Sequence, residues 1–348
     1  GDAIPSVTIV VSGQPGDPWL PTTLESVLGQ TYADSTVLVV DGGLSEETRE
    51  EVMRFAEPEG LIDAPTTPAA WDGDDRARDV GARAASGDLL LFVGPGTVLA
   101  PVALRIMVEQ LEARGLGLLS VIPRLAMPSA GERAAGPGFA MLPFGFVPMW
   151  WSALTGGRPA ATAVADAGLL LVDRLAYLAA VEGASPGSRP RGGRGLARAV
   201  AARGQRVGMI HGASLAVRHL DGTTAGAIDR WRRIVASESA SIAAAVGVIV
   251  LELAAFVAPL LLLPAAILGR AGTPILAAAT VPLVMLVLFR FALAVTQRQP
   301  LESIAWHPVT VALAIVGQVA GIVDRVRGTP VADVATPLEG EEVVHSVT

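Results

Sequence analysis

Residues 76–93 of the chain read RARDVGARAASGDLLLFV, and this stretch joins two kinds of secondary structure. The region Asp74–Ala85 predicts a helix. Leu89–Val93 is a short run of apolar residues, as expected of a strand that is buried on both faces. The stretch therefore predicts a helix followed by a buried strand, which is the unit from which parallel α/β sheets are built.

The same alternation extends in both directions along the chain. Apolar residues of Leu20–Gln30 recur at helical spacing. Ser45 can cap a further helix, because Glu46 and Glu47 follow in its first turn, where the helix dipole favours negative charge. The other predicted strands are short and apolar: Ser6–Ser12, Thr36–Val40, Leu116–Ile122, Gly168–Val172 and Arg206–Ile210. We therefore predict an α/β fold with a mixed, mostly parallel sheet that helices cover on both faces.

The composition sets limits on the class of protein. Of the 348 residues, 51% are hydrophobic and 17% are charged, and the mean hydropathy is +0.50. Because a soluble domain carries about 25% charged residues, this chain is too apolar to be a soluble globule throughout. A formal net charge of −7 argues against a nucleic-acid partner. Cysteine is absent, so disulfides and thiolate chemistry are excluded.

Long apolar segments follow Ser241. Ile242–Leu268 and Pro274–Val295 each have the roughly 20 residues that a membrane-spanning helix needs. Val309–Val323 is short and either crosses a locally thinned bilayer or lies in its interface, so its topology stays open. We therefore divide the chain into a domain over residues 1–233, a membrane region over 241–323 and a polar tail over 324–348.

Arginines beside these segments predict their orientation. Arg230, Arg232 and Arg233 precede the first span and Arg298 follows the second, which places those ends in the cytoplasm by the positive-inside rule. The early apolar run Ile4–Val11 is too short for a signal peptide and lacks a basic flank. We expect a multi-pass protein of the cell membrane whose N-terminal domain is cytoplasmic.

Three further features of the apolar regions allow alternatives. Met127–Trp151 is rich in Gly, Pro and aromatic residues, and it is either a loop packed on the domain or a segment that dips into the bilayer edge, which we favour. Glu252 and Arg290 are ionisable residues within predicted spans, where charge is costly. These two residues either pair with each other, or Arg290 extends to the membrane surface.

Several motifs occur in the order found in one enzyme family. They are PSVTIVVS (5–12), SVLGQTY (26–32), VLVVDGG (37–43), RARDVGARAASGD (76–88), AGLLLVDRLAYLAAVEG (167–183), GLARAVAARGQRVGM (195–209) and Arg230-Trp231. From about Pro5 to Trp231 the chain thus resembles the family-2 glycosyltransferases, which have the GT-A fold and use nucleotide sugars. The apolar insert and the C-terminal helices are similar to the subgroup of hopanoid-associated and carotenoid-type enzymes.

The resemblance implies a nucleotide sugar and a lipid-like acceptor as partners, beside membrane lipid. Ligands of α/β sheets bind at the carboxyl ends of strands, here near Asp41 and Gly94. Asp41 either binds the nucleotide base or only terminates its strand. The implied nucleotide-sugar-binding residues are Ser12, Asp41, Arg78, Gly94 and Gly96. The implied residues on the acceptor or membrane side are Trp150, Trp151, Arg230 and Trp231.

The chain departs from the family at the positions that bind the metal and supply the catalytic base. The family has Asp-x-Asp, which holds Mg²⁺ or Mn²⁺ on the donor diphosphate, where this chain has Gly94-Pro95-Gly96. Divalent cations of this kind need oxygen ligands that these side chains lack. Gly192-Gly193 replaces the family's Glu-Asp pair, which carries the base. We therefore assign no catalytic residue, no metal ligand and no cofactor, and note that the arginines of Arg189–Arg194 can supply positive charge.

Two hypotheses follow from these departures. The first is a membrane-anchored family-2 glycosyltransferase that transfers a sugar to a lipid-like acceptor. The second is a catalytically inactive binding or scaffold module that keeps the fold at the membrane.

Overall fold

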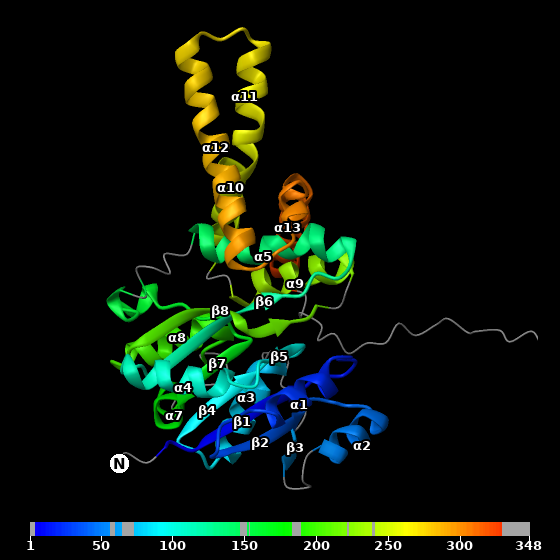
Figure 1. Cartoon of the computed structure of the whole chain (residues 1–348), viewed down its shortest axis with the longest axis vertical. Coiled ribbons are helices and arrows are strands. Elements are labelled where there is room, and N and C mark those ends of the chain that lie inside the picture. Colours follow the sequence, from blue (N-terminus) through cyan, green and yellow to red (C-terminus); the bar gives the residue numbers. More distant parts are fainter. Residues whose placement is uncertain are drawn as a thin grey trace, which may run out of the picture.

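The structure is a computed structural model of the chain. It describes residues 4–55, 60–64, 73–146, 152, 154–182, 189–220, 223–238 and 241–328. An α/β domain forms one end of the molecule, and long helices project from it at the other end (Figure 1).

A single sheet organises the domain. Its eight described strands lie in the order β3-β2-β1-β4-β7-β6-β8-β5. The pairs β1–β2, β1–β4, β2–β3 and β6–β8 are parallel, and the pairs that involve β7 or β5 are antiparallel. The strands are β1 Val7–Gly13, β2 Ser35–Asp41, β3 Leu61–Asp63, β4 Leu89–Val93, β5 Thr97–Leu99, β6 Leu118–Leu125, β7 Leu169–Asp173 and β8 Val207–Arg218. The predicted mixed, mostly parallel sheet is confirmed.

Helices cover both faces of this sheet. Successive side chains of a strand point to opposite faces, so apolar strands such as β1 need a helical layer on each side. In β1, Ile9 faces the core under α1, α2 and α4, whereas Val10 faces the core under α3, α7 and α8. Both side chains are almost completely buried. The helices are α1 Leu20–Leu28, α2 Glu46–Phe55, α3 Gly73–Ala84, α4 Ala103–Ala113, α7 Arg174–Val181 and α8 Gly192–Ala202.

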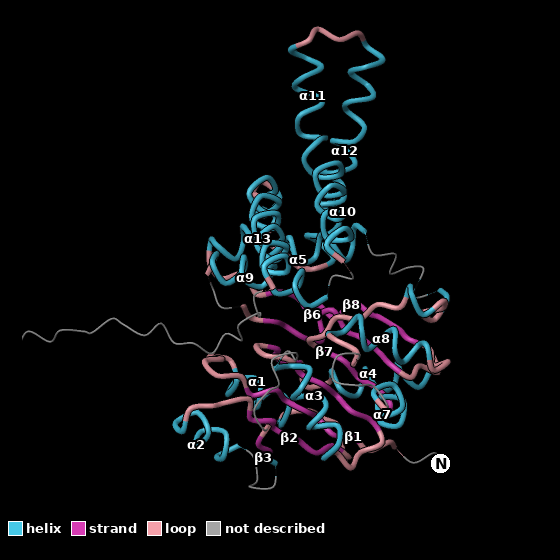
Figure 2. Tube along the Cα trace, turned by 180° about the vertical axis from the view of Figure 1, so that it is seen from behind, coloured by secondary structure: helices cyan, strands magenta, loops and turns pink. Residues whose placement is uncertain are grey.

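In the part of the chain that the structure describes, three helices are long and apolar enough to cross a membrane. The first covers Ile242–Leu268 and consists of α10 (Ile242–Glu252), a π-helical segment (Leu253–Val257) and α11 (Ala258–Leu268). The second is α12 (Thr273–Thr296), which returns beside α11 as a hairpin (Figure 2). The third is α13 (His307–Arg327), whose 21 residues exceed the 15 expected from its apolar run.

Two further helices connect the sheet domain to these long helices. They are α5 (Ala130–Phe146) and α9 (Thr224–Glu238), which lie between the sheet and the projecting helices (Figure 1). α13 packs along α9 and also contacts α5 and α10. Most of the stretch 127–151 that we expected as a loop or a bilayer-edge segment is thus a helix, α5, which contacts α9, α12 and α13.

Ionisable residues inside the long helices have other partners than expected. Gln318 of α13 donates from its Nε2 to both carboxylate oxygens of Glu252, at 2.8 and 2.9 Å. Arg290 donates to the carbonyl oxygen of Ser303 at 2.9 Å and is only 1% exposed. Glu252 and Arg290 therefore form no pair with each other in the structure, and Arg290 does not extend to the surface. Polar groups so placed join helices to one another within an apolar layer.

Candidate donor site at the carboxyl edge of the sheet

The candidate site lies where β1, β2 and β4 end. These strands are parallel neighbours, and their registers pair Gly13 with Asp41 and Val11 with Val93. Ser12, Asp41 and Gly94 therefore lie along one edge of the sheet, where α/β folds bind their ligands.

Ser12 belongs to a hydrogen-bonded group at this edge. Its hydroxyl donates to Oδ1 of Asp74 at 3.1 Å, and Gln14 donates from Nε2 to both Ser12 and Asp74. The Ser12 side chain is nearly buried. These contacts fasten the end of β1 to the first turn of α3.

Both carboxylate oxygens of Asp41 lie close to other groups of the chain. Its Oδ1 accepts from the backbone N–H groups of Gly43 and Leu44 at 2.8 and 2.7 Å. Its Oδ2 lies 2.5 Å from a guanidinium nitrogen of Arg49. The residue is 3% exposed. Asp41 thus shapes the turn after β2.

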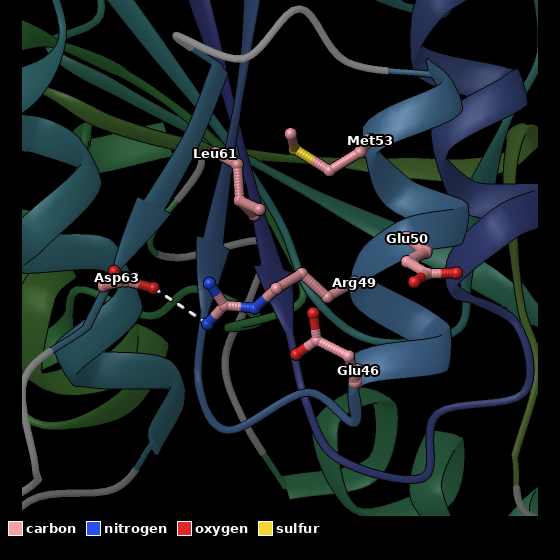
Figure 3. Close-up of a pocket in the computed structure, with 6 residues that line it drawn as sticks. All are labelled: Glu46, Arg49, Glu50, Met53, Leu61 and Asp63. Carbon is pink, nitrogen blue, oxygen red and sulfur yellow. Dashed lines mark hydrogen bonds and ion pairs between the residues drawn. The ribbon is translucent and has the colours of Figure 1, made fainter.

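An open hollow of about 450 Å³ lies beside this turn, over α2 and β3. Figure 3 shows Arg49 in it, directed toward Asp63, with which it forms a 2.9 Å hydrogen bond. Because the same guanidinium also reaches Asp41, Arg49 joins the ends of β2 and β3 to α2. Glu46 and Glu50 also line the hollow, and their charge disfavours an anionic ligand there.

Arg78 joins α3 to two other parts of the domain. Its guanidinium pairs with Asp75 and donates to the carbonyl oxygen of Ala167 at 3.1 Å. Asp75 in turn accepts from the backbone N–H of Gly192 at 3.0 Å. Arg78 therefore helps to position the segment before β7 and the start of α8, next to the site.

The loop Gly94–Gly96 is held through its main chain. Gly94 N–H donates to the Gly168 carbonyl at 2.9 Å, and Gly96 N–H donates to Asp17 at 3.3 Å. His219 N–H donates to the Gly96 carbonyl at 2.8 Å, and its ring stacks on Trp19 with 3.8 Å between centroids.

Burial raises the pKa of Asp17, the N–H groups of Trp19 and Gly96 oppose this shift, and the charge of Asp74 adds to it. Burial also lowers the pKa of His219. Both shifts follow from the enclosed surroundings of the loop.

The fit of a divalent metal at this loop can be judged from its donor groups. Neither glycine nor Pro95 offers a side-chain oxygen, and the loop amides already have acceptors. Within the described residues, no three His, Cys, Asp or Glu side chains gather closely enough to hold a metal ion. The described residues of the loop therefore do not fit the metal site that the family resemblance implies, and we derive no step through a metal.

The position corresponding to the family's base has no room for a side chain. A β-carbon on Gly193 would lie 2.6 Å from both the Ala165 carbonyl oxygen and the Ala167 amide nitrogen. The segment 165–167 thus fills the space in front of α8. Arg189, one of the arginines considered as a source of positive charge, instead pairs with Asp79 at 2.8 Å.

Asp166 and Arg218 form an ion pair at this edge that the sequence did not reveal. Arg218 ends β8, and its guanidinium lies 3.0 Å from Oδ1 of Asp166, which also accepts from the Gly168 N–H. Burial opposes ionisation of Asp166, but the charges of Arg218 and Arg230 and the Gly168 hydrogen bond hold its pKa below the usual range. The only local signal was an arginine that ends an apolar strand.

The residues expected on the membrane side lie at the junction with the long helices. Trp231 is 3% exposed and stacks on Phe139 of α5, with 4.6 Å between ring centroids, and the Arg230 guanidinium lies over the same Phe139 ring. Trp231 is thus a packing residue between α5, α9 and α13. Trp150 and Trp151 lie outside the described residues.

Comparisons with known proteins agree with this geometry. Residues 6–135 match the family model described as Glycosyl transferase family 2. The mannosyltransferase PcManGT from Pyrobaculum calidifontis, solved in complex with GDP-Man and Mn²⁺, aligns over 93% of this chain and 90% of its own length. Its sequence identity is 18% and its TM-score is 0.50.

Two other solved structures align less completely. TarS of S. aureus aligns over 66% of this chain and 39% of its own, with 12% identity and a TM-score of 0.45. Glucosyl-3-phosphoglycerate synthase from Mycobacterium tuberculosis, in complex with Mg²⁺ and UDP, aligns over 60% and 69%, with 14% identity and a TM-score of 0.40. No curated protein matches the sequence.

The fold of the N-terminal domain is of the GT-A type. Residues 6–135 lie within this domain and match the Glycosyl transferase family 2 model, and among the described residues three helices able to cross a membrane follow the domain.

Replacing Gly94 and Gly96 together by aspartate is expected not to create a metal site. Gly96 has φ +66°, and a β-carbon there would lie 2.6 Å from the His219 carbonyl oxygen, so the substitution strains the loop. We expect a lower melting temperature and no Mn²⁺ binding by calorimetry. Gly115→Asp is the control, because Gly115 has φ +57° but open surroundings. Micromolar Mn²⁺ binding at unchanged stability would contradict this prediction.

Proposed function

We propose that this protein is a membrane-anchored glycosyltransferase that holds a nucleotide sugar at the carboxyl edge of its sheet and takes a lipid-like acceptor from the bilayer. One observation carries the proposal. β8 ends at Arg218 beside the loop Gly94–Gly96, and α9, which docks α13, begins at Thr224. The candidate donor site and the layer that contacts the long helices are therefore only a few residues apart.

The match to the family model supports a nucleotide sugar as the donor. The matched residues 6–135 contain Ser12, Asp41, Arg78, Gly94 and Gly96, and PcManGT was solved with a nucleotide sugar on the same fold. Loops at the ends of β1, β2 and β4 form the edge where such folds bind ligands.

The placement of the long helices supports a lipid-like acceptor. α5 and α9 lie between the sheet and these helices, so an acceptor in the bilayer would approach the domain from that side (Figure 2). Arg230 and Trp231 lie in this layer, and the charge of Arg230 acts on Asp166 at the donor edge. Headgroups near the membrane surface would thus meet positive charge next to the site.

We also propose that the N-terminal domain is cytoplasmic and that the turn between α11 and α12 is exposed outside. The chain has no cysteine, so single cysteines can be labelled without background. We expect Ala271→Cys, in that turn, to react with a membrane-impermeant maleimide in intact cells. Glu25→Cys, on the exposed side of α1, should react only after permeabilisation. The opposite labelling pattern would contradict this topology.

A catalytically inactive module is the second candidate, and Gly193 is the observation that favours it. The main chain of 165–167 leaves no space for a carboxylate at this position. Residue 193 of α8 therefore cannot supply the general base that the family carries there. Such a protein would bind the donor at the membrane without transferring its sugar.

One experiment separates the two candidates. Membranes that contain the full chain are supplied with radiolabelled uridine- and guanosine-diphosphate sugars, and both donor binding and label in the lipid extract are measured. Transfer supports the enzyme, and it should fall for Asp41→Asn but not for Arg105→Gln, a surface control on α4. Binding without transfer supports the inactive module. Absence of binding for every donor would contradict both.

A further inference from the structure

The buried arginine at the end of β8 has an environment built around its guanidinium. Arg218 is 4% exposed. Its Nε donates to the Thr97 hydroxyl at 3.3 Å, and its NH2 group contacts Asp166 at 3.0 Å. A β-carbon on Gly168 would lie 1.3 Å from that NH2 group, so only glycine lets the side chain pass. The guanidinium therefore lies against the residue that is hydrogen-bonded to Gly94.

This position coincides with the loop that lacks metal ligands. Gly94 and Gly168 are adjacent across β4 and β7, and a β-carbon on Gly94 would point to within 3.2 Å of the Gly168 α-carbon. A side chain at residue 94 would thus extend toward the place where the guanidinium lies. The Arg218 guanidinium thus lies where a carboxylate on this loop would otherwise hold a divalent metal ion.

A guanidinium suits a diphosphate for physical reasons. It stays charged at all relevant pH values, and its forked N–H groups match two phosphate oxygens at once. Because the surroundings are poorly solvated, its attraction for an anion is stronger than at an exposed surface. A divalent metal ion bound to the diphosphate would act chiefly by neutralising its negative charge, as the guanidinium does.

Asp166 is the acidic partner of this cation. The Asp166 side chain is one-third exposed, whereas the Arg218 side chain is buried. Asp17 and Asp74 add negative charge near the loop, so a diphosphate approaching the edge meets repulsion unless it gains Arg218. An incoming anion that takes the guanidinium must displace Asp166 toward solvent.

We propose that Arg218 receives the diphosphate of the donor in place of a divalent metal, and that Asp166 occupies the guanidinium until the donor binds. This proposal rests on the proposed function, since it assumes a nucleoside-diphosphate donor at this edge. It makes donor binding independent of metal.

The test measures binding of GDP and UDP to the full chain in detergent, with EDTA or with Mg²⁺ or Mn²⁺. The wild type should bind one of them equally well in all three conditions. Arg218→Gln should weaken binding about tenfold or more, as expected for loss of a charge-assisted contact. Asp166→Asn should strengthen it about threefold to tenfold, because the competing carboxylate is neutralised. Arg105→Gln should bind like the wild type.

Asp166→Asn distinguishes ligand binding from a purely structural ion pair. If Arg218 only supported the fold, removing its partner's charge would lower the melting temperature without any gain in nucleotide affinity, and the proposal would be wrong. Nucleotide binding that requires Mg²⁺ or Mn²⁺ would overturn it while the proposed function stands. Absence of GDP and UDP binding by both the wild type and Asp166→Asn would overturn both.

Discussion

Gly317→Ala is expected to loosen α13 from α9 and to destabilise the whole chain. Gly317 and Gly321 are four residues apart and face α9, where small residues let helices approach closely. A β-carbon on Gly317 would lie 2.5 Å from the Trp231 β-carbon and 2.6 Å from the Ile228 carbonyl oxygen. Because backbone and a buried tryptophan must move, we expect a loss of about 1–3 kcal/mol.

The measurement is the melting temperature of the purified chain in detergent. Gly247→Ala is the matched control, because Gly247 is also in a long helix but has nothing within 4 Å of its would-be β-carbon. That control should be neutral or slightly stabilising, since alanine favours helix more than glycine does. Equal melting temperatures for the two variants would show that α13 does not rest on α9 as described.

Gly168→Ala is expected to abolish nucleotide binding without changing any charge. The added methyl group would occupy the space of the Arg218 guanidinium, which must leave Asp166 and Thr97. We expect loss of measurable GDP and UDP affinity, together with lower stability because the displaced cation loses its partners. Gly272→Ala in the turn before α12 controls for the effect of alanine at a loop glycine, because Gly272 has φ −67° and the nearest atom to its would-be β-carbon is Pro274 Cδ at 3.8 Å.

The readout is nucleotide titration of both variants, with circular dichroism to confirm the fold. Retained nucleotide binding by a folded Gly168→Ala variant would show that the guanidinium can move without consequence. In that case the strand-edge cation would have no part in donor binding.

The sheet was largely predictable because its central strands are unbroken apolar runs. Leu89–Val93 is buried at every position and coincides with the predicted strand. The long helices were predictable for the same reason, and Ile242–Leu268 matches its expected bounds. β3 and β5 were not predicted, because each has only three residues. A segment of that length is too short to show the alternation of apolar and polar residues that distinguishes a strand from a loop. α5 was missed because Pro137 and several glycines are typical of loops.

Sequence alone predicted only those parts of the candidate site that directly follow a predicted strand. Asp41 and Gly94 follow apolar strands, so parallel pairing alone brings them together. The contact of Asp166 with Arg218 depends on how β7 and β8 are placed around β6, and no local pattern records that arrangement. The crowding at Gly193 likewise arises from the packing of segment 165–167 against α8. The sequence shows only that residue 193 is a glycine.

The order of synthesis gives the position of α13 a consequence for folding. α13 contacts α5, α9 and α10, and all three of these helices precede it in the chain. Until α13 leaves the ribosome, the face of α9 that holds Trp231 and the Glu252 carboxylate in α10 both lack their contacts with Gly317 and Gln318 of α13. The domain and the α11–α12 hairpin can therefore form first, while their joining waits for the synthesis of α13.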